Sequence, residues 1–206
     1  MKADKIAVII LSGGNSSRMN YPKAFLSIGK KTLVEHLSTI YFDFGIQKPI
    51  IVLNSILYKE EWAEIISKLS IDNTVLKNNF TELGRSYSIN LGLKEVKKEQ
   101  GCFIQNIDNP DISVGLLNNM LVHLKDDSYV VPANNGINGH PILLGKEILN
   151  HLKNLQGNDW ILKDELKKFN KIQVEATENN VMLNLNTEAD WKIYSESIQN
   201  KSVQLN

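Results

Sequence analysis

The 206-residue sequence has a single cysteine, no excess charge of either sign and no long apolar run. One thiol, Cys102, cannot form a disulfide within the chain, which argues against a disulfide-stapled secreted domain. Lysine plus arginine equals aspartate plus glutamate at 23 each, so no overall field favours nucleic acid or an acidic membrane. No apolar stretch approaches the roughly 20 residues of a membrane helix, and the opening MKADK lacks a signal-peptide layout. We therefore expect a cytoplasmic protein without nucleic-acid or membrane partners.

Arginine is also scarce, because only Arg18 and Arg85 stand among the 23 basic residues. Since lysine supplies most of the positive charge, we expect the two arginines to be placed for their planar set of donors, which suits a phosphate or a base edge. The alternative for each is a solvated surface position without a ligand.

Short apolar runs alternate with segments of helical spacing along most of the chain. The runs cover residues 6–11, 49–54, 73–77, 101–107, 128–132, 141–144 and 171–176. Between them, apolar residues recur on one helix face, as in Leu33, Leu37, Ile40 and Phe44. This alternation predicts an α/β fold, a Rossmann-like three-layer sandwich with a mostly parallel sheet and helices on both faces. After Pro132 the order is less regular, and we expect segments 171–176 and 181–185 to add edge strands and a wall over the site.

The segment after the first apolar run is rich in glycine and small polar residues. It reads LSGGNSSRMNYPK at 11–23, and in an open α/β sheet the ligand lies beyond the carboxyl ends of the strands. Gly13 and Gly14 let backbone N–H groups approach a ligand, while Arg18 and Lys23 add positive charge. The common phosphate loops do not fit, because GxGxxG is absent and GKKT at 29–32 lacks the earlier glycine and the preceding strand of a P-loop. A polar turn without function is the alternative, but the polar run exceeds a connection of about 2 to 6 residues.

The stretch LSGGNSSRMNYPKAFLSIGKKTLVEH resembles the signature of the MobA-like nucleotidyltransferases, roughly L-A-[AG]-G-x-S-S-R-M-G-x-x-K-x-L-L-x-x-x-G-x-x-L-L. Ser12 replaces the usual alanine and Asn20 the usual glycine. The resemblance implies that the loop wraps a nucleoside triphosphate, with Arg18 and Lys23 as catalytic cations on the phosphates. The nucleotide-binding residues that it implies here are Leu11, Ser12, Gly13, Gly14, Ser16, Ser17, Arg18 and Lys23.

Asp108 follows the fourth apolar run in the sequence IDNP, at the sheet edge where we expect the first loop. A carboxylate there suits Mg²⁺, which takes one or two carboxylates together with phosphate oxygens, whereas a plain turn start is the alternative. The family is similar, with Gly-Asp-Gln-Pro at this point, which implies that Asp108 is a catalytic metal ligand. Ile107 replaces the glycine of that pattern, and Asp111 is the alternative acid.

The segment NLNTEADW at 184–191 is similar to D-I-D-T-P-E-D-L of the family and implies a second metal position at Asn186. An amide oxygen can bind a hard cation, but without a charge the affinity for the metal should be lower. Thr187 and Asp190 also match a capping box at a helix start, which gives the segment a structural reason.

The segment ELGRSYSINLGL at 82–93 predicts a helix whose N-terminus offers free N–H groups to an anion. The family has a similar G-x-S-x-S-L-x-x-G-L, which implies nucleotide contacts from Gly84, Arg85, Ser86 and Ser88. Alternatively, Ser86 caps the helix and Arg85 is solvated.

NGINGHPILL at 135–144 is similar to the R-G-H-P-V-L-L block of the cytidylyl-transferring branch and implies that His140 contacts the acceptor. A packed, hydrogen-bonded histidine is an equal alternative. Asn138 replaces the usual arginine, and GNDWIL at 157–162 only faintly resembles G-D-x-G-x-R of the family. The acceptor is therefore the least determined part of the interpretation.

The resemblance runs from Ile6 to Trp191 and implies transfer of a nucleoside monophosphate from CTP or GTP to a phosphate-bearing acceptor, molybdopterin, with Mg²⁺ as cofactor and release of pyrophosphate. The GHP block favours CTP, whereas Gly13 and the Lys23-Ala24 pair are closer to the guanylyl branch. A transient contact with the molybdoenzyme that receives the product, or with its chaperone, is also implied. We predict one domain over residues 1–206, with a nucleotide-binding part at about 1–132 and an acceptor-side part at about 133–198.

Two rival functions stay open. One is a nucleotidyltransferase for a sugar phosphate or another small molecule, which would share the fold. The other is a non-catalytic, nucleotide-binding regulatory protein, which is motivated by Asn184 and Asn186 at positions where acids are expected.

Overall fold

The computed structural model describes residues 2–13, 21–176 and 183–203, with side chains described up to residue 198. Within these residues, eight strands form one sheet in the order β10-β7-β9-β6-β1-β4-β5, with β8 paired to the end of β7. The strands are β1 (Ile6–Ser12), β4 (Ile50–Asn54), β5 (Thr74–Asn78), β6 (Gly101–Asn106), β7 (Ser128–Asn134), β8 (Ile137–Asn138), β9 (Ile142–Gly145) and β10 (Asn170–Glu175). Strand β1 pairs in parallel with β4 and β6, β4 with β5 and β7 with β10, while β9 runs antiparallel to β6 and β7. The mostly parallel sheet predicted from the sequence is confirmed.

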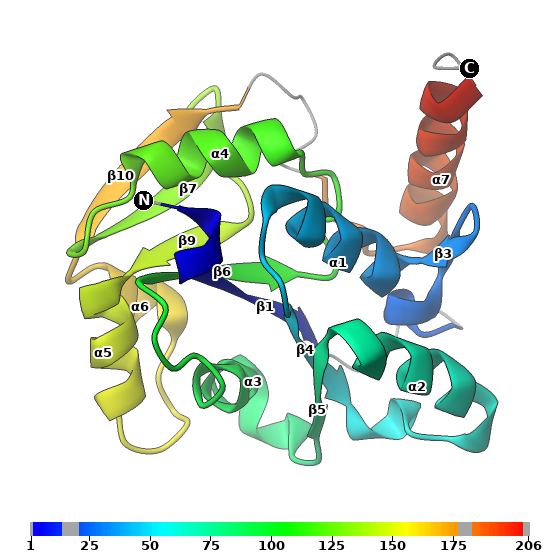
Figure 1. The fold of residues 1–206 in the computed structure, drawn as a ribbon, viewed down its shortest axis with the longest axis horizontal. Coiled ribbons are helices and arrows are strands. Elements are labelled where there is room, and N and C mark those ends of the chain that lie inside the picture. Colours follow the sequence, from blue (N-terminus) through cyan, green and yellow to red (C-terminus); the bar gives the residue numbers. More distant parts are fainter. Residues whose placement is uncertain (1, 14–20, 177–182, 204–206) are drawn as a thin grey trace.

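Helices cover both faces of this sheet (Figure 1). They are α1 (Leu33–Phe44), α2 (Ala63–Asp72), α3 (Gly84–Leu93), α4 (Val114–His123), α5 (Lys146–Asn154), α6 (Leu162–Leu166) and α7 (Glu188–Val203). Alternate residues of β1 point to opposite faces, so that Val8 and Ile10 join the core under α1 and α4, whereas Ile9 joins the core under α3 and α5. A strand that is apolar on both faces requires cover on both sides, and this explains the three-layer α/β sandwich.

A small hairpin leads into α1. Strands β2 (Ser27–Ile28) and β3 (Lys31–Thr32) pair antiparallel, and Thr32 then begins the helix. The Thr32 hydroxyl accepts from the Glu35 N–H at 3.4 Å, and the Glu35 carboxylate accepts from the Thr32 N–H at 2.7 Å. This capping box satisfies N–H groups that the first helical turn leaves without partners.

The part after Pro132 agrees with the sequence prediction at β10, which forms one edge of the sheet. The prediction is wrong at residues 183–185, which lie in no strand, and residues 181 and 182 fall outside the described part. The physical reason is that the Leu183 carbonyl and the Leu185 N–H bond to Asn109 and Asp108 rather than to a neighbouring strand. No helix among the described residues is long and apolar enough to cross a membrane.

Candidate active site

The first loop and Asp108 leave the sheet at the same edge. Strands β1 and β6 are parallel neighbours, with Leu11 opposite Asn106, and the Ile107 N–H donates to the Leu11 carbonyl at 3.0 Å. The residues after Ser12 and after Asn106 therefore emerge side by side at the carboxyl ends of the strands, where ligands bind in open α/β sheets.

Lys23 and Asp108 form an ion pair at this edge, with 3.0 Å between Nζ and Oδ1. The Lys23 side chain is only 10% exposed and the Asp108 side chain 35% exposed, so the pair is partly shielded from water. Among the described residues no hydrogen bond reaches Oδ2 of Asp108, and this oxygen is available to a ligand. The two predicted catalytic residues of the described part are thus brought together.

Arg85 and His140 are two further ionisable groups that are linked electrostatically to Asp108, Arg85 directly and His140 through Arg85. Burial lowers the pKa of Arg85, and the Asp108 carboxylate opposes this shift. Burial, together with the positive charge of Arg85, lowers the pKa of His140 to about 4. Among the described residues, this edge therefore brings the basic groups Lys23 and Arg85 beside the Asp108 carboxylate and, at neutral pH, a neutral His140 imidazole.

His140 is packed and hydrogen bonded. Its Nε2 lies 3.2 Å from Nδ2 of Asn106, and its Nδ1 is buried without a hydrogen-bond partner among the described residues. A neutral imidazole accepts at one nitrogen and donates at the other, which agrees with the lowered pKa. This geometry favours the structural alternative for His140, while contact with an acceptor stays a prediction.

The N-terminal turn of α3 lies against the start of the first loop. The Ser88 hydroxyl accepts from Nδ2 of Asn78 at 2.9 Å, and a Cβ on Gly13 would stand 2.7 Å from that hydroxyl. The alternative that Ser86 caps the helix is wrong, because Leu83 holds the N-cap position without a side-chain cap and Ser86 Oγ donates to the Asn158 carbonyl instead. Only a residue without a side chain fits at Gly13 without displacing Ser88.

Two amides that the sequence analysis did not select support the loop. Asn54 and Asn78 close β4 and β5 and are almost fully buried. Nδ2 of Asn54 lies 3.4 Å from the Gly13 carbonyl, while Asn78 binds Ser88. The signal was present in the sequence, because an amide that ends an apolar run predicts a polar group at the carboxyl edge of a parallel sheet.

The segment before α7 also reaches the site. The Leu185 N–H donates to the Asp108 carbonyl at 2.8 Å, which places the predicted metal ligand Asn186 one residue from Asp108's backbone partner. The capping box is confirmed, since Asp190 N–H donates to the Thr187 hydroxyl and the Asp190 carboxylate accepts from the N–H groups of Thr187 and Asn186. Hydrogen bonding to Thr187 and Asn186, with a contribution from Lys23, lowers the pKa of Asp190. Asp190 is a second acid near Lys23 that the sequence analysis gave only a structural role.

The donor set fits a magnesium ion that is completed by substrate. No group of three or more histidine, cysteine, aspartate or glutamate side chains with metal-binding potential occurs in the described part. Mg²⁺ commonly takes one or two protein ligands and fills its remaining positions with water and phosphate oxygens. The Asp108 carboxylate is of the ligand type that this ion takes. Gly14, Ser16, Ser17 and Arg18 lie outside the described residues.

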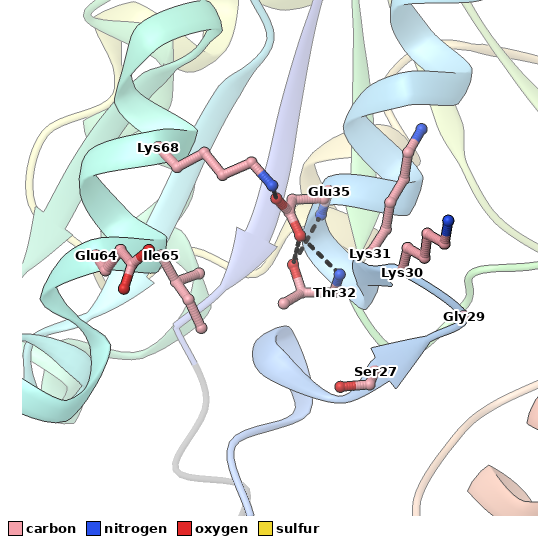
Figure 2. Close-up of a pocket in the computed structure, with 9 residues that line it drawn as sticks. All are labelled: Ser27, Gly29, Lys30, Lys31, Thr32, Glu35, Glu64, Ile65 and Lys68. Atoms are coloured by element: carbon pink, nitrogen blue, oxygen red, sulfur yellow. Dashed lines mark hydrogen bonds and ion pairs between the residues drawn. The ribbon is translucent and has the colours of Figure 1, made fainter.

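Two pockets differ in their relation to this edge. Figure 2 shows the first, about 250 Å³, between the β2–β3 hairpin and α2, where the Lys68 ammonium meets Glu35 at 2.9 Å. Burial would raise the pKa of Glu35, but its bonds from Thr32 and Lys68 lower it overall, so the carboxylate and Lys68 satisfy each other. The second pocket, about 310 Å³, includes Arg85 and Ser86 in its wall. The second pocket is linked to the predicted site through the electrostatic interaction of Arg85 with Asp108.

A polar loop, a lysine and an acid at the carboxyl edge of an α/β sheet define a nucleotide-binding protein of the nucleotidyltransferase class. Residues 8–170 match the MobA-like NTP transferase domain, and the chain belongs to this family. The prediction of the family and of its fold is thereby confirmed.

Relatives with curated names carry out nucleotidyl transfer. A probable molybdenum cofactor guanylyltransferase of Natranaerobius thermophilus is 32% identical over 145 residues, which are 66% of this chain and 63% of that protein. A molybdenum cofactor cytidylyltransferase of Escherichia coli is 25% identical over 187 residues, which are 90% of this chain and 93% of that protein. The match thus spans less than two thirds of the guanylyltransferase and nearly all of the cytidylyltransferase.

A solved structure confirms the architecture. A nucleotidyl transferase from Methanothermobacter thermautotroptrophicus superposes with a TM-score of 0.76 at 19% identity, over 95% of this chain and 98% of that one. At this identity the likeness concerns the fold alone.

Proposed function

We propose that this protein transfers a nucleoside monophosphate from CTP or GTP to a phosphate group of a molybdopterin-like acceptor, with Mg²⁺ as cofactor. The observation that carries the proposal is the Lys23–Asp108 ion pair at the edge where the glycine-rich loop begins. When a triphosphate and its metal ion bind, the Lys23 ammonium can contact the phosphates and the Asp108 carboxylate can contact the metal ion.

In the proposed reaction an oxygen of the acceptor phosphate attacks the α-phosphorus of the nucleotide. A new phosphorus–oxygen bond forms, the bond from the α-phosphorus to the oxygen that bridges to the β-phosphate breaks, and pyrophosphate leaves with that electron pair. No protein nucleophile is needed, so the protein contributes positioning and charge stabilisation.

The residues of the edge have separate tasks. Lys23 and Arg85 face the negative charge that spreads over the phosphates, together with Arg18 from the loop outside the described residues. Asp108 and Asn186 would hold Mg²⁺, which when bound neutralises charge on phosphate oxygens. Gly13 lets the start of the loop pack closely against α3, since a Cβ there would collide with Ser88.

We assign the acceptor to the pocket of about 310 Å³ beside α3. Its wall combines Arg85 and Ser86 with residues 158–163, from the part predicted to lie on the acceptor side. Arg85 thus belongs both to the pocket and to the electrostatic environment of Asp108. A phosphate-bearing acceptor in this pocket would meet a cation on the side that faces the nucleotide.

The test is pyrophosphate release with labelled CTP or GTP, Mg²⁺ and molybdopterin, with a sugar phosphate as the alternative acceptor. Release with one nucleotide only when molybdopterin is present supports the proposal and identifies the donor. Release only with the sugar phosphate moves the function to the first rival. Tight nucleotide binding without release under all conditions supports the regulatory rival.

A further inference from the structure

A buried glutamine lies at the end of the strand that carries Asp108. Gln105 is 0% exposed in β6, which runs next to the central strand β1. Its neighbours in β6, Phe103 and Ile104, are apolar and fully buried. A buried amide without partners costs free energy, and Gln105 has hydrogen-bond partners on both sides.

On one side, Gln105 is held by helix α1. The hydroxyl of Tyr41 donates to Oε1 of Gln105 at 2.9 Å, and Tyr41 is itself 0% exposed. Burial raises the pKa of Tyr41 well above its ordinary value, so its phenol remains a donor throughout the working range of pH. The Tyr41 ring also packs on Phe103, with 5.6 Å between ring centroids. Helix α1 therefore fixes the orientation of the glutamine amide.

On the other side, Gln105 is hydrogen bonded to the turn that contains Asp108. Its Nε2 donates to the carbonyl oxygens of Asn106 and Asn109, each at 2.7 Å. The same turn is closed by the Asn109 N–H, which donates to the Asn106 carbonyl at 3.3 Å. Asp108 thus sits in a four-residue turn whose first and last carbonyls bind one buried amide.

Asn109 connects this turn to the second chain segment of the site, residues 183–186. Its side chain is buried, Nδ2 donates to the Leu183 carbonyl at 2.8 Å, and Oδ1 accepts from Nδ2 of Asn106 at 3.2 Å. With the bond from Leu185 N–H to the Asp108 carbonyl, two links join the turn to the segment that continues into Asn186.

We propose that Tyr41, Gln105 and Asn109 are positioning residues, which fix the Asp108 carboxylate and the Asn186 segment relative to each other for metal and triphosphate binding. The inference rests on the proposed function, since it assumes that Asp108 binds the metal. A purely structural role is the alternative. The two are separable because a lost positioning contact typically weakens metal binding by about 10- to 100-fold, whereas the loss of a purely structural contact lowers the free energy of unfolding and leaves the metal affinity of the folded protein unchanged.

The decisive variant is the double substitution Tyr41→Phe with Gln105→Met, which removes both partners of the Tyr41–Gln105 bond, retains their volume and withdraws the amide donor from the Asn106 and Asn109 carbonyls. The matched control is Ser38→Ala, because Ser38 also lies on α1 and donates its hydroxyl to a buried amide oxygen, that of Asn73, at 2.6 Å. Binding of Mn²⁺ in the presence of CTP or GTP is measured from the electron paramagnetic resonance signal of free Mn²⁺, together with hydrogen exchange of residues 106–109 by mass spectrometry.

The double variant is expected to bind Mn²⁺ at least about tenfold more weakly and to exchange faster at residues 106–109, whereas Ser38→Ala matches the wild type in both. Asn109→Ala provides a second variant, with faster exchange expected at residues 183–186 and weaker Mn²⁺ binding. Wild-type Mn²⁺ affinity and exchange in the double variant and in Asn109→Ala would overturn the positioning role and leave the proposed function standing. If Asp108→Asn binds Mn²⁺ like the wild type, the metal assignment itself is wrong and both proposals fail.

Discussion

Lys23 and Asp108, 85 positions apart in the sequence, meet with 3.0 Å between Nζ and Oδ1 at the edge where β1 and β6 end. The Asp108 carboxylate compensates the charge of the Lys23 ammonium at a site that is largely shielded from water. The ion pair also places a cation next to the proposed metal position before any ligand binds.

Replacing Lys23 by methionine keeps an unbranched side chain, one atom shorter, and removes its charge. Because one charge-assisted hydrogen bond contributes about 1.5–3 kcal/mol, we expect the Kd for CTP or GTP to rise by roughly 10- to 100-fold, as measured by isothermal titration calorimetry. Lys30→Met, at the hairpin pocket of Figure 2, is the matched control and should retain wild-type affinity. Equal affinities for the two variants would remove Lys23 from the nucleotide site.

Asn186→Asp restores a carboxylate at the second metal position. A charged ligand oxygen binds a hard cation more strongly than an amide oxygen, so the Mg²⁺ concentration for half-maximal activity should fall by about tenfold. The variant should fold normally, because the contact of Asn186 with Asp190 uses its backbone N–H. Asn184→Asp adds the same charge at an exposed position two residues earlier and should have a smaller effect. An unchanged Mg²⁺ dependence in Asn186→Asp would separate that side chain from the metal.

The lowered pKa of His140 predicts that the folded protein loses stability as the pH falls. Burial and Arg85 lower its pKa from an ordinary value of 6.5 to about 4. Between pH 6.5 and about 4, His140 is therefore protonated in the unfolded chain but not in the folded chain. The stabilisation from the neutral imidazole is complete above pH 6.5 and is lost as the pH falls through about 4.

His140→Gln removes this proton and should flatten the dependence of the unfolding midpoint on pH between 6.5 and 4, as measured by thermal denaturation. His123→Gln, at the exposed end of α4, should keep the slope of the wild type. A wild-type slope in His140→Gln would show that this imidazole does not govern the acid response.

The acceptor pocket is tested at Ile161, which is 62% exposed and lies in the wall that also contains Arg85. Ile161→Glu should raise the KM for a phosphate-bearing acceptor by about tenfold or less, since an exposed like charge repels by only about 1 kcal/mol in water. The KM for the nucleotide should stay unchanged. Ile71→Glu, on the more exposed face of α2, controls for added charge. A rise in the nucleotide KM instead would assign this pocket to the donor.

The fold was predictable because its signals are local. A buried parallel strand reads as an unbroken apolar run, and the runs at 6–11 and 101–107 coincide with β1 and β6 to within a residue. The insertion of β9 between β6 and β7 was not predictable in this way, because strand order depends on contacts that no single run contains. The end of β6 shows the same limit, since Gln105 interrupts the apolar pattern for a partner, Tyr41, that lies 64 positions away.

The candidate site was predictable where a polar residue follows an apolar run. Asp108 is such a residue, and Asn54 and Asn78 gave the same signal without being selected. Asp190 could not be separated from its capping role, because Thr187 explains it locally and its proximity to Lys23 arises only from the packing of the chain before α7. Ser86 shows the converse, where a residue typical of helix caps is used for a long-range contact with Asn158.

The central claim is that the loop after β1 and Asp108 bind one triphosphate. It is tested most directly by a crystal structure with Mg²⁺ and an α,β-methylene analogue of CTP or GTP, in which the bond to be broken is replaced by a stable one. The account predicts Mg²⁺ on the Asp108 carboxylate, the α-phosphate beside Lys23, and the triphosphate against the backbone at Gly13. A triphosphate bound elsewhere, with Lys23 and Asp108 still paired and no metal between them and the phosphates, would contradict it.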